Sequence, residues 1–81
     1  MTCEVKISYF AILRDQRGVS EEVLSFNGTT PQELYSYLQE KFGLTFKPEN
    51  LRVAVNDSFA PWQTELKSGD KVAFIPPVSG G

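Results

Sequence analysis

The stretch TPQELYSYLQEKFG, residues 30–43, carries the strongest structural signal in the sequence and predicts one long helix. Thr30 occupies the N-cap position, Pro31 the first helical position and Glu33 the third, which is the spacing of a capping box. Gly43 follows as a left-handed stop. Local residues therefore define both ends of this helix.

The same helix carries an apolar stripe that needs a second layer. Leu34, Leu38 and Phe42 recur at i, i+4 and i+8, so they lie on one side of it. Before the helix, EEVLSF at residues 21–26 predicts a strand, and a short turn joins the two. A helix with one apolar side is buried by packing against a sheet or another helix.

Further outward, CEVKISYF at residues 3–10 predicts a first strand because apolar and polar residues alternate along it. Val5, Ile7 and Tyr9 fall on one face, and the polar residues fall on the other. Phe10 breaks the alternation, since it falls on the polar face. An aromatic ring is therefore expected to meet solvent at the end of this strand.

The remaining ordered segments are predicted as a short helix and two strands, at residues 11–18, 51–56 and 71–75. The long loop before the last strand holds a short strand near Phe59 or Glu65. Alternation in the last strand leaves Ile75 on the face away from the helix. Pro76 and Pro77 end that strand because neither has an N–H for the ladder.

This order of elements predicts an α+β fold of the β-grasp (ubiquitin-like) type. We expect a mixed sheet of four to five strands with one long helix packed across one face. The domain is expected to span residues 1–75, with an extended tail over residues 76–81. The first and last strands are central neighbours in such a sheet, so Phe10 and Ile75 are predicted to share a patch on the open face, with Phe59 beside them.

Two interpretations of this patch stay open at the level of sequence. Single exposed apolar residues are common on protein surfaces, and a bulge can shift the phase at the end of a strand. Contiguous apolar surface on a small domain, by contrast, usually marks a partner site. We favour the partner site.

Composition excludes several classes of function. The 81 residues make one domain with a net charge of −2 and no basic cluster, which argues against a nucleic-acid partner. There is no apolar run of about 20 residues that could cross a membrane. Histidine is absent and Cys3 is the sole cysteine, so no metal site and no Ser/His or Cys/His catalytic pair is expected. A buried Cys3 in a reducing, cytoplasmic environment fits this composition.

The tail, PPVSGG at residues 76–81, suggests chemistry at the chain end. Pro76-Pro77 is stiff and extended, and the six residues can reach roughly 20 Å at about 3.3 Å per residue. Gly80 and Gly81 have no Cβ and can pass through a narrow slot. A thin arm with an unhindered terminal carboxylate has the features of a delivered substrate, although a frayed end is the simpler alternative.

The segment GDKVAFIPPVSGG, residues 69–81, resembles the C-terminal signature of the small subunits of molybdopterin synthase, the MoaD family. The stretches AVN at residues 54–56 and YFAILRD at residues 9–15 are similar to that family too, and the resemblance covers essentially the whole chain. A terminal Gly-Gly is shared by ubiquitin-like sulfur carriers in general. The Pro-Pro-Val-Ser-Gly-Gly form points to this branch.

The resemblance implies a sulfur-transfer cycle at the chain end. An activating enzyme that uses ATP and magnesium adenylates the Gly81 carboxylate, and sulfur from a persulfide donor displaces AMP to leave a thiocarboxylate. A larger subunit, which binds the cyclic pyranopterin monophosphate precursor, then receives the tail and the sulfur. Two large and two small subunits form the family's heterotetramer. No cofactor is expected on this chain itself.

Roles carry over by matching positions. The residues implied to thread the partner's active site ahead of Gly81 are Pro76, Pro77, Val78, Ser79 and Gly80. Those implied to contact the large subunit and the activating enzyme are Phe10, Phe59, Ile75 and Arg14. Ile75 departs from the phenylalanine common in the family and loses any ring stacking, and Arg14 is equally well explained as a solvated helix charge.

Three alternatives remain. A carrier for thiamine synthesis or tRNA thiolation shares the chemistry, but its relatives seldom carry Pro-Pro before Gly-Gly. A ubiquitin-like modifier joins an activated Gly81 to lysines of other proteins. A plain β-grasp interaction module would carry its two final glycines by accident.

Overall fold

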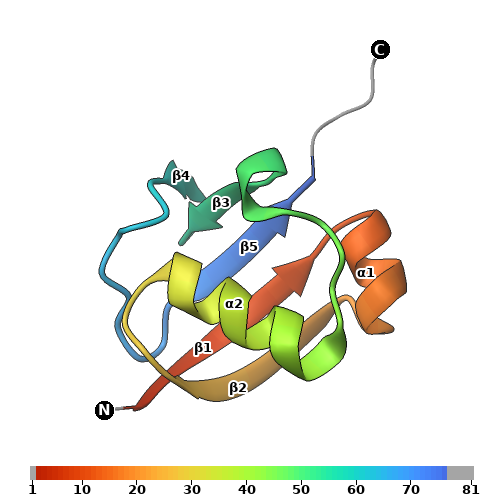
Figure 1. Cartoon of the computed structure of the whole chain (residues 1–81). Coiled ribbons are helices and arrows are strands. Elements are labelled where there is room, and N and C mark those ends of the chain that lie inside the picture. Colours follow the sequence, from red (N-terminus) through yellow and green to blue (C-terminus); the bar gives the residue numbers. More distant parts are fainter. Residues whose placement is uncertain (1, 77–81) are drawn as a thin grey trace.

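Regular structure follows the predicted order along residues 2–76, the part of the chain that the computed structural model describes (Figure 1). The strands are β1 (Thr2–Tyr9), β2 (Glu21–Asn27), β3 (Arg52–Val55), β4 (Ser58–Ala60) and β5 (Lys71–Ile75). The helices are α1 (Ile12–Arg17) and α2 (Pro31–Phe42), with a 3-10 turn at Pro48–Asn50. Residues 1 and 77–81 lie outside the described part.

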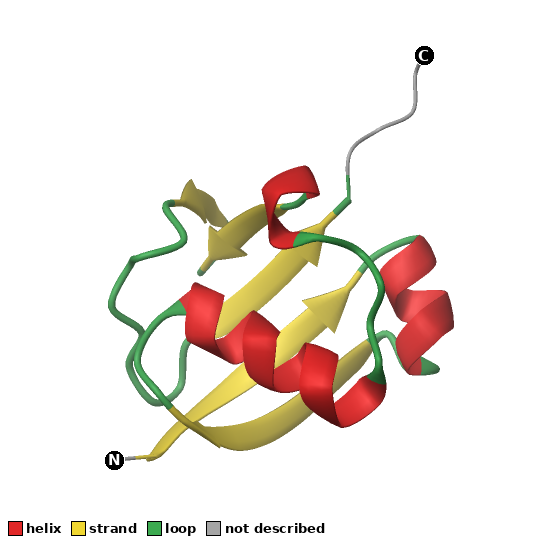
Figure 2. Cartoon of the chain, viewed as in Figure 1, coloured by secondary structure: helices red, strands yellow, loops and turns green. Residues whose placement is uncertain are grey.

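The five strands form one mixed sheet in the order β2-β1-β5-β3-β4. The first and last strands, β1 and β5, are parallel neighbours in its centre, and the other pairings are antiparallel. Helix α2 crosses one face of this sheet (Figure 2), and within residues 2–76 no helix packs across the other face. The predicted β-grasp architecture is thus confirmed, with β4 at the Phe59 position rather than near Glu65.

Helix α2 begins and ends where the sequence predicts. The Thr30 hydroxyl accepts a hydrogen bond from the Glu33 N–H at 3.2 Å, and the Glu33 carboxylate accepts one from the Thr30 N–H at 3.2 Å. This capping box satisfies two backbone donors that the first turn leaves unpaired. Gly43 ends the helix with φ 70°, in the left-handed region that glycine favours.

The core lies between α2 and the sheet. The fully buried residues from both layers include Val5, Ile7, Leu34, Leu38, Val72 and Phe74. Tyr35, which the predicted stripe omits, is also buried, and its hydroxyl donates to the Phe46 carbonyl at 2.8 Å. Trp62 closes one end of the core by stacking on Phe74, with 5.9 Å between ring centroids. Within the described part of the chain, the core thus occupies the α2 side of the sheet and leaves the other side uncovered.

Candidate partner-binding site

A row of small side chains crosses the open face of the sheet. Ser8 on β1 pairs with Ala73 on β5, Ala73 pairs with Ala54 on β3, and Ala54 pairs with Phe59 on β4. Residues directly opposite each other on neighbouring strands point to the same side of the sheet. Because the first three are small, the middle of the open face lies lower than its margins.

Larger side chains, most of them apolar but with Asp57 and Lys71 among them, surround this row and make an open-face hollow of about 260 Å³. Phe10, Phe59 and Ile75 all line it, together with the small residues of the row. Phe10 is 46% exposed and Phe59 is 63% exposed. The structure thus brings together the three apolar residues predicted to share a patch, and Phe10 does face away from the core. Their role in binding a partner stays a prediction.

The hairpin between β3 and β4 holds Phe59 at the margin of the hollow. Asn56 and Asp57 have φ 52° and 72°, as a two-residue hairpin loop of type I′ requires. Asn56 also ties the loop to the start of β5: its side-chain oxygen accepts from the Lys71 N–H, and its side-chain amide donates to Asp70, both at 3.0 Å. No local sequence pattern indicates this structural role of Asn56.

The Asp70 carboxylate completes this connection. It accepts from the Lys67 backbone N–H at 2.8 Å and from the Asn56 amide at 3.0 Å. These hydrogen bonds favour the charged form and so hold the pKa of Asp70 below its usual value. The hydrogen bond from Lys67 has the largest effect. On the other side of the hairpin, the Arg52 guanidinium lies 4.7 Å from the centre of the Phe59 ring, within the range of a cation–π contact.

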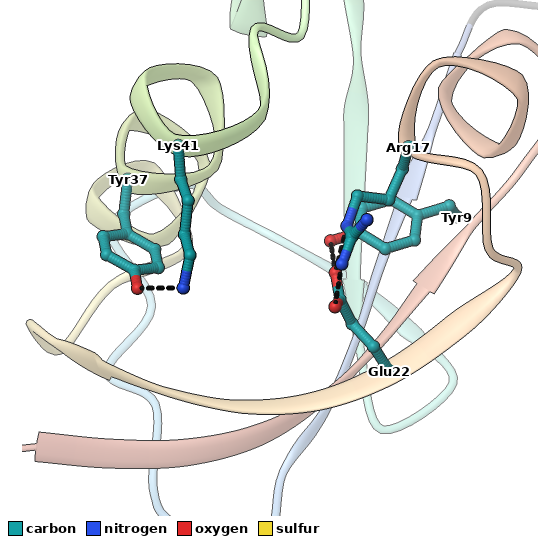
Figure 3. A network of polar contacts seen from close by, with 5 residues as sticks. All are labelled: Tyr9, Arg17, Glu22, Tyr37 and Lys41. Carbon is teal, nitrogen blue, oxygen red and sulfur yellow. Dashed lines mark hydrogen bonds and ion pairs between the residues drawn. The ribbon is translucent and has the colours of Figure 1, made fainter.

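A second polar cluster, which no sequence pattern predicts, includes Tyr9, the residue immediately before Phe10 (Figure 3). This Glu22 cluster consists of Tyr9, Arg17 and Glu22. Arg17 donates to both carboxylate oxygens of Glu22, at 2.6 and 2.8 Å, and the Tyr9 hydroxyl donates to Glu22 at 2.6 Å. The cluster joins β1, α1 and β2 next to the point where the chain leaves β1, which ends at Tyr9.

The charges of this cluster stabilise one another. The bidentate Arg17 contact is the main reason that the pKa of Glu22 lies below its usual value, and Glu22 in turn raises the pKa of Arg17. Burial, followed by the hydrogen bond to Glu22, raises the pKa of Tyr9. All three groups therefore keep a single protonation state near neutral pH.

The other predicted site residues are not part of the hollow. Arg14 is exposed on α1 and does not line it. Pro76 is buried directly after Ile75. The remaining tail residues, for which threading and sulfur-transfer roles are predicted, lie outside the described part of the chain: Pro77, Val78, Ser79, Gly80 and Gly81.

Within residues 2–76, no group of three or more His, Cys, Asp or Glu residues is placed to hold a metal ion. The helices in that same part of the chain are too short or too polar to cross a membrane.

Comparison with known proteins relates both the fold and the tail to a family. Residues 7–81 match the ThiS family. The molybdopterin synthase sulfur carrier subunit of Mycobacterium tuberculosis is 40% identical over 81 residues, a match that covers 96% of this chain and 98% of that protein.

Solved structures show the same architecture. The small archaeal modifier protein 1 of Methanosarcina acetivorans superposes with a TM-score of 0.82 at 25% identity and covers 100% of this chain and 99% of its own. A chain from the complex of subunits 1 and 2 of the molybdopterin-converting factor of Helicobacter pylori superposes with a TM-score of 0.65 at 32% identity, over 96% of this chain and 99% of that one.

Proposed function

Because the chain belongs to the ThiS family, we propose that it is the sulfur-carrier small subunit of a molybdopterin synthase. The observation that carries this proposal is the full-length similarity to a molybdopterin synthase sulfur carrier subunit, at 40% identity. The family match extends to Gly81, so it includes the tail on which the chemistry depends.

The proposed reaction takes place at the carboxylate of Gly81. An activating enzyme transfers AMP from ATP, with magnesium, to this carboxylate and releases pyrophosphate. The terminal sulfur of a persulfide then attacks the acyl carbon and AMP leaves, which gives an acyl disulfide. A thiol attacks the donor sulfur of this S–S bond, so that the thiol and the donor form a disulfide and the thiocarboxylate is released. The sulfur passes to the cyclic pyranopterin monophosphate precursor on the large subunit. This chain supplies the carrier, and its partners supply the catalytic side chains and bind the cofactors.

The open-face hollow fits the docking part of this proposal. Its lining is mostly apolar, with Asp57 and Lys71 as the charged residues, and at about 260 Å³ it is slightly smaller than the roughly 300 Å³ at which small-molecule pockets begin. Such a hollow suits an apolar side chain of a protein partner. Ile75 lines it and is followed by Pro76, and the five residues beyond Pro76 can span at most roughly 16 Å. A subunit seated on the hollow would have the tail within its reach.

A comparison with a solved complex supports the choice of partner. In the Helicobacter pylori structure, the similar chain is part of a complex of subunits 1 and 2 of the molybdopterin-converting factor. We propose an equivalent large subunit for this chain, in an assembly of two large and two small subunits. We also place the protein in the cytoplasm, where a reducing environment suits the free, buried Cys3.

A second candidate function is protein modification. The superposition with small archaeal modifier protein 1 covers 100% of this chain, so the fold alone does not separate a sulfur carrier from a modifier. Both uses begin with adenylation of Gly81. They differ in the final acceptor, which is a pterin in one case and a lysine amine in the other.

The test is to incubate the protein with the activating enzyme, ATP, magnesium and a sulfur donor, and to measure its intact mass. We expect the mass change of one oxygen replaced by sulfur, and molybdopterin once the large subunit and the pterin precursor are added. An unchanged mass would point to a plain interaction module. Loading without molybdopterin, with a competent large subunit present, would point to the thiamine or tRNA branch, and a ladder of conjugates would point to a modifier.

A matched pair of variants tests the reacting group. One alanine appended after Gly81 blocks the terminal carboxylate and should abolish sulfur loading, whereas the same alanine added before Met1 should leave loading unchanged. Both variants should fold alike, because neither addition touches the core. Normal loading of the C-terminally extended chain would exclude the Gly81 carboxylate as the reacting group.

A further inference from the structure

Phe10 reaches the hollow from a short turn rather than from a strand. Strand β1 ends at Tyr9, and Ala11 has φ 52° and ψ −124°, a conformation that residues with a Cβ rarely adopt. The Phe10 carbonyl accepts from the Leu13 N–H at 3.1 Å, which closes the turn into α1. The direction of the Phe10 ring therefore depends on where α1 is held.

Helix α1 cannot hold itself in place. It has six residues, well below the length at which a helix is stable in isolation, and Leu13 is its one buried residue. Gln16 and Thr45 exchange two hydrogen bonds, at 2.7 and 3.1 Å, and so attach the outer side of α1 to the segment after α2. This contact is exposed to solvent, so a second attachment is needed to fix the helix.

The Glu22 cluster supplies that second attachment (Figure 3). The Arg17 and Glu22 side chains are 22% and 17% exposed, so their bidentate pair is largely shielded from water. The Arg17 guanidinium also lies 3.7 Å from the centre of the Phe42 ring on α2. Glu22 thus joins the last residue of α1 to Tyr9, the residue immediately before Phe10.

We propose that Glu22 is a positioning residue for partner binding: by holding α1 against the end of β1, it keeps the strained Phe10–Ala11 turn closed and the Phe10 ring at the margin of the open-face hollow. The inference rests on the proposed function, since the partner that would sense Phe10 is the large subunit. Glu22 does not line the hollow, so it would contribute to the affinity for the large subunit only through the position of Phe10.

The test measures binding of the large subunit to Glu22→Gln, to Phe10→Ala and to the double variant, at a temperature where all are folded. Glu22→Gln removes the charge that holds Arg17 while keeping the size of the side chain. We expect it to weaken binding about five- to tenfold in the wild-type background and less than about twofold in the Phe10→Ala background, because coupled residues are not additive. Full additivity, or wild-type affinity of folded Glu22→Gln, would overturn the proposal.

Glu33→Gln is the matched control. It removes a carboxylate whose hydrogen bonds cap α2 and is remote from the hollow. We expect it to lower stability without changing affinity, so a purely structural role for Glu22 would give the same result as this control. The comparison therefore separates loss of fold from loss of position.

A measurement on the isolated protein keeps the proposal testable if the proposed function fails. If the wild-type chain does not bind the large subunit at all, the proposed function is wrong, and NMR relaxation of the Phe10 ring still reports on its positioning. We expect the ring to be ordered in the wild type and in Glu33→Gln, and mobile in Glu22→Gln. Equal order in all three proteins would overturn the role of Glu22.

Discussion

The two faces of the sheet are built by alternate residues of the same strands, yet their surfaces differ. On the α2 side, Ile7 and Phe74 are fully buried, and the space above them is filled by the helix. On the open side, their neighbours Ser8 and Ala73 are small and partly covered, and Phe10 stands exposed beside them. The α2 face buries its apolar area within the chain itself. The other keeps apolar area whose burial requires a second molecule.

The largest expected effect lies on the α2 face. Leu34→Ala removes a fully buried side chain and leaves a cavity, so we expect a loss of about 2–5 kcal/mol in the free energy of unfolding. Urea denaturation measures it, with Ser36→Ala, exposed on the same helix, as the control. Affinity for the partner should be unchanged for the folded fraction. If Leu34→Ala lowered the free energy of unfolding by less than about 1 kcal/mol, packing on the α2 face would not be the main source of stability.

On the open face we expect the reverse, with a large loss of binding and a small change in stability. Phe10→Asp should weaken binding of the large subunit by about 2 kcal/mol or more, as loss of an aromatic anchor at an interface does, while stability changes by about 0.5 kcal/mol or less. Val23→Asp introduces the same charge at an exposed position outside the hollow and should leave binding intact. A large loss of stability in Phe10→Asp would mean that Phe10 belongs to the core.

A larger side chain inside the hollow should weaken binding of the large subunit less than the Phe10→Asp substitution does. Ala73→Leu places a larger side chain in the middle of the small row, and we expect affinity to fall about tenfold, or about 1.4 kcal/mol. Titration calorimetry measures the change. Ser25→Leu adds apolar bulk at an exposed position on β2, outside the hollow, and serves as the control. Unchanged affinity of Ala73→Leu would show that the partner does not enter the hollow.

The smallest expected effect concerns pH. The pKa of Glu22 in the folded chain lies below its ordinary value of 4.5, so its stabilisation is present above that value and is lost as the pH falls through the lowered pKa. Glu22→Gln should therefore be less stable than the wild type near pH 7, by about 1 kcal/mol, and the difference should shrink in acid.

Glu21→Gln is the control for this pH dependence. Glu21 is an exposed carboxylate 3.9 Å from Lys6, and such surface pairs contribute little, so its removal should barely alter the stability curve. Denaturation between pH 3 and pH 7 distinguishes the two variants. A constant gap between Glu22→Gln and the wild type over this range would exclude the Glu22 charge as its source.

Local signals explain why much of this contrast could be predicted from the sequence. The capping box at Thr30 and Glu33 depends on neighbours in the chain, and the alternation from Val5 to Tyr9 depends on the period of a strand. The grouping of Phe10 with Ile75 followed from the expected adjacency of the first and last strands. The geometry that these signals predict agrees with the structure.

The contacts that position the candidate site could not be predicted in the same way. Glu22 lies five residues from Arg17 and thirteen from Tyr9, and no sequence pattern indicates that the three side chains meet. The same holds for Asn56 and Asp70, which approach only after β3 and β5 pair. The placement of β4 also stayed open between Phe59 and Glu65, because a three-residue strand has too few residues to show a period.

The parallel pairing of β1 and β5 has a mechanical consequence. Their register runs from Lys6 beside Lys71 to Tyr9 beside Phe74, so the beginning of β1 and the end of β5 lie at opposite ends of the shared ladder. A pulling force applied at these two points loads all the hydrogen bonds between the strands in shear, whereas force on the ends of a hairpin opens its bonds one at a time. An enzyme that draws on the chain beyond Ile75 would therefore work against a domain that resists unravelling.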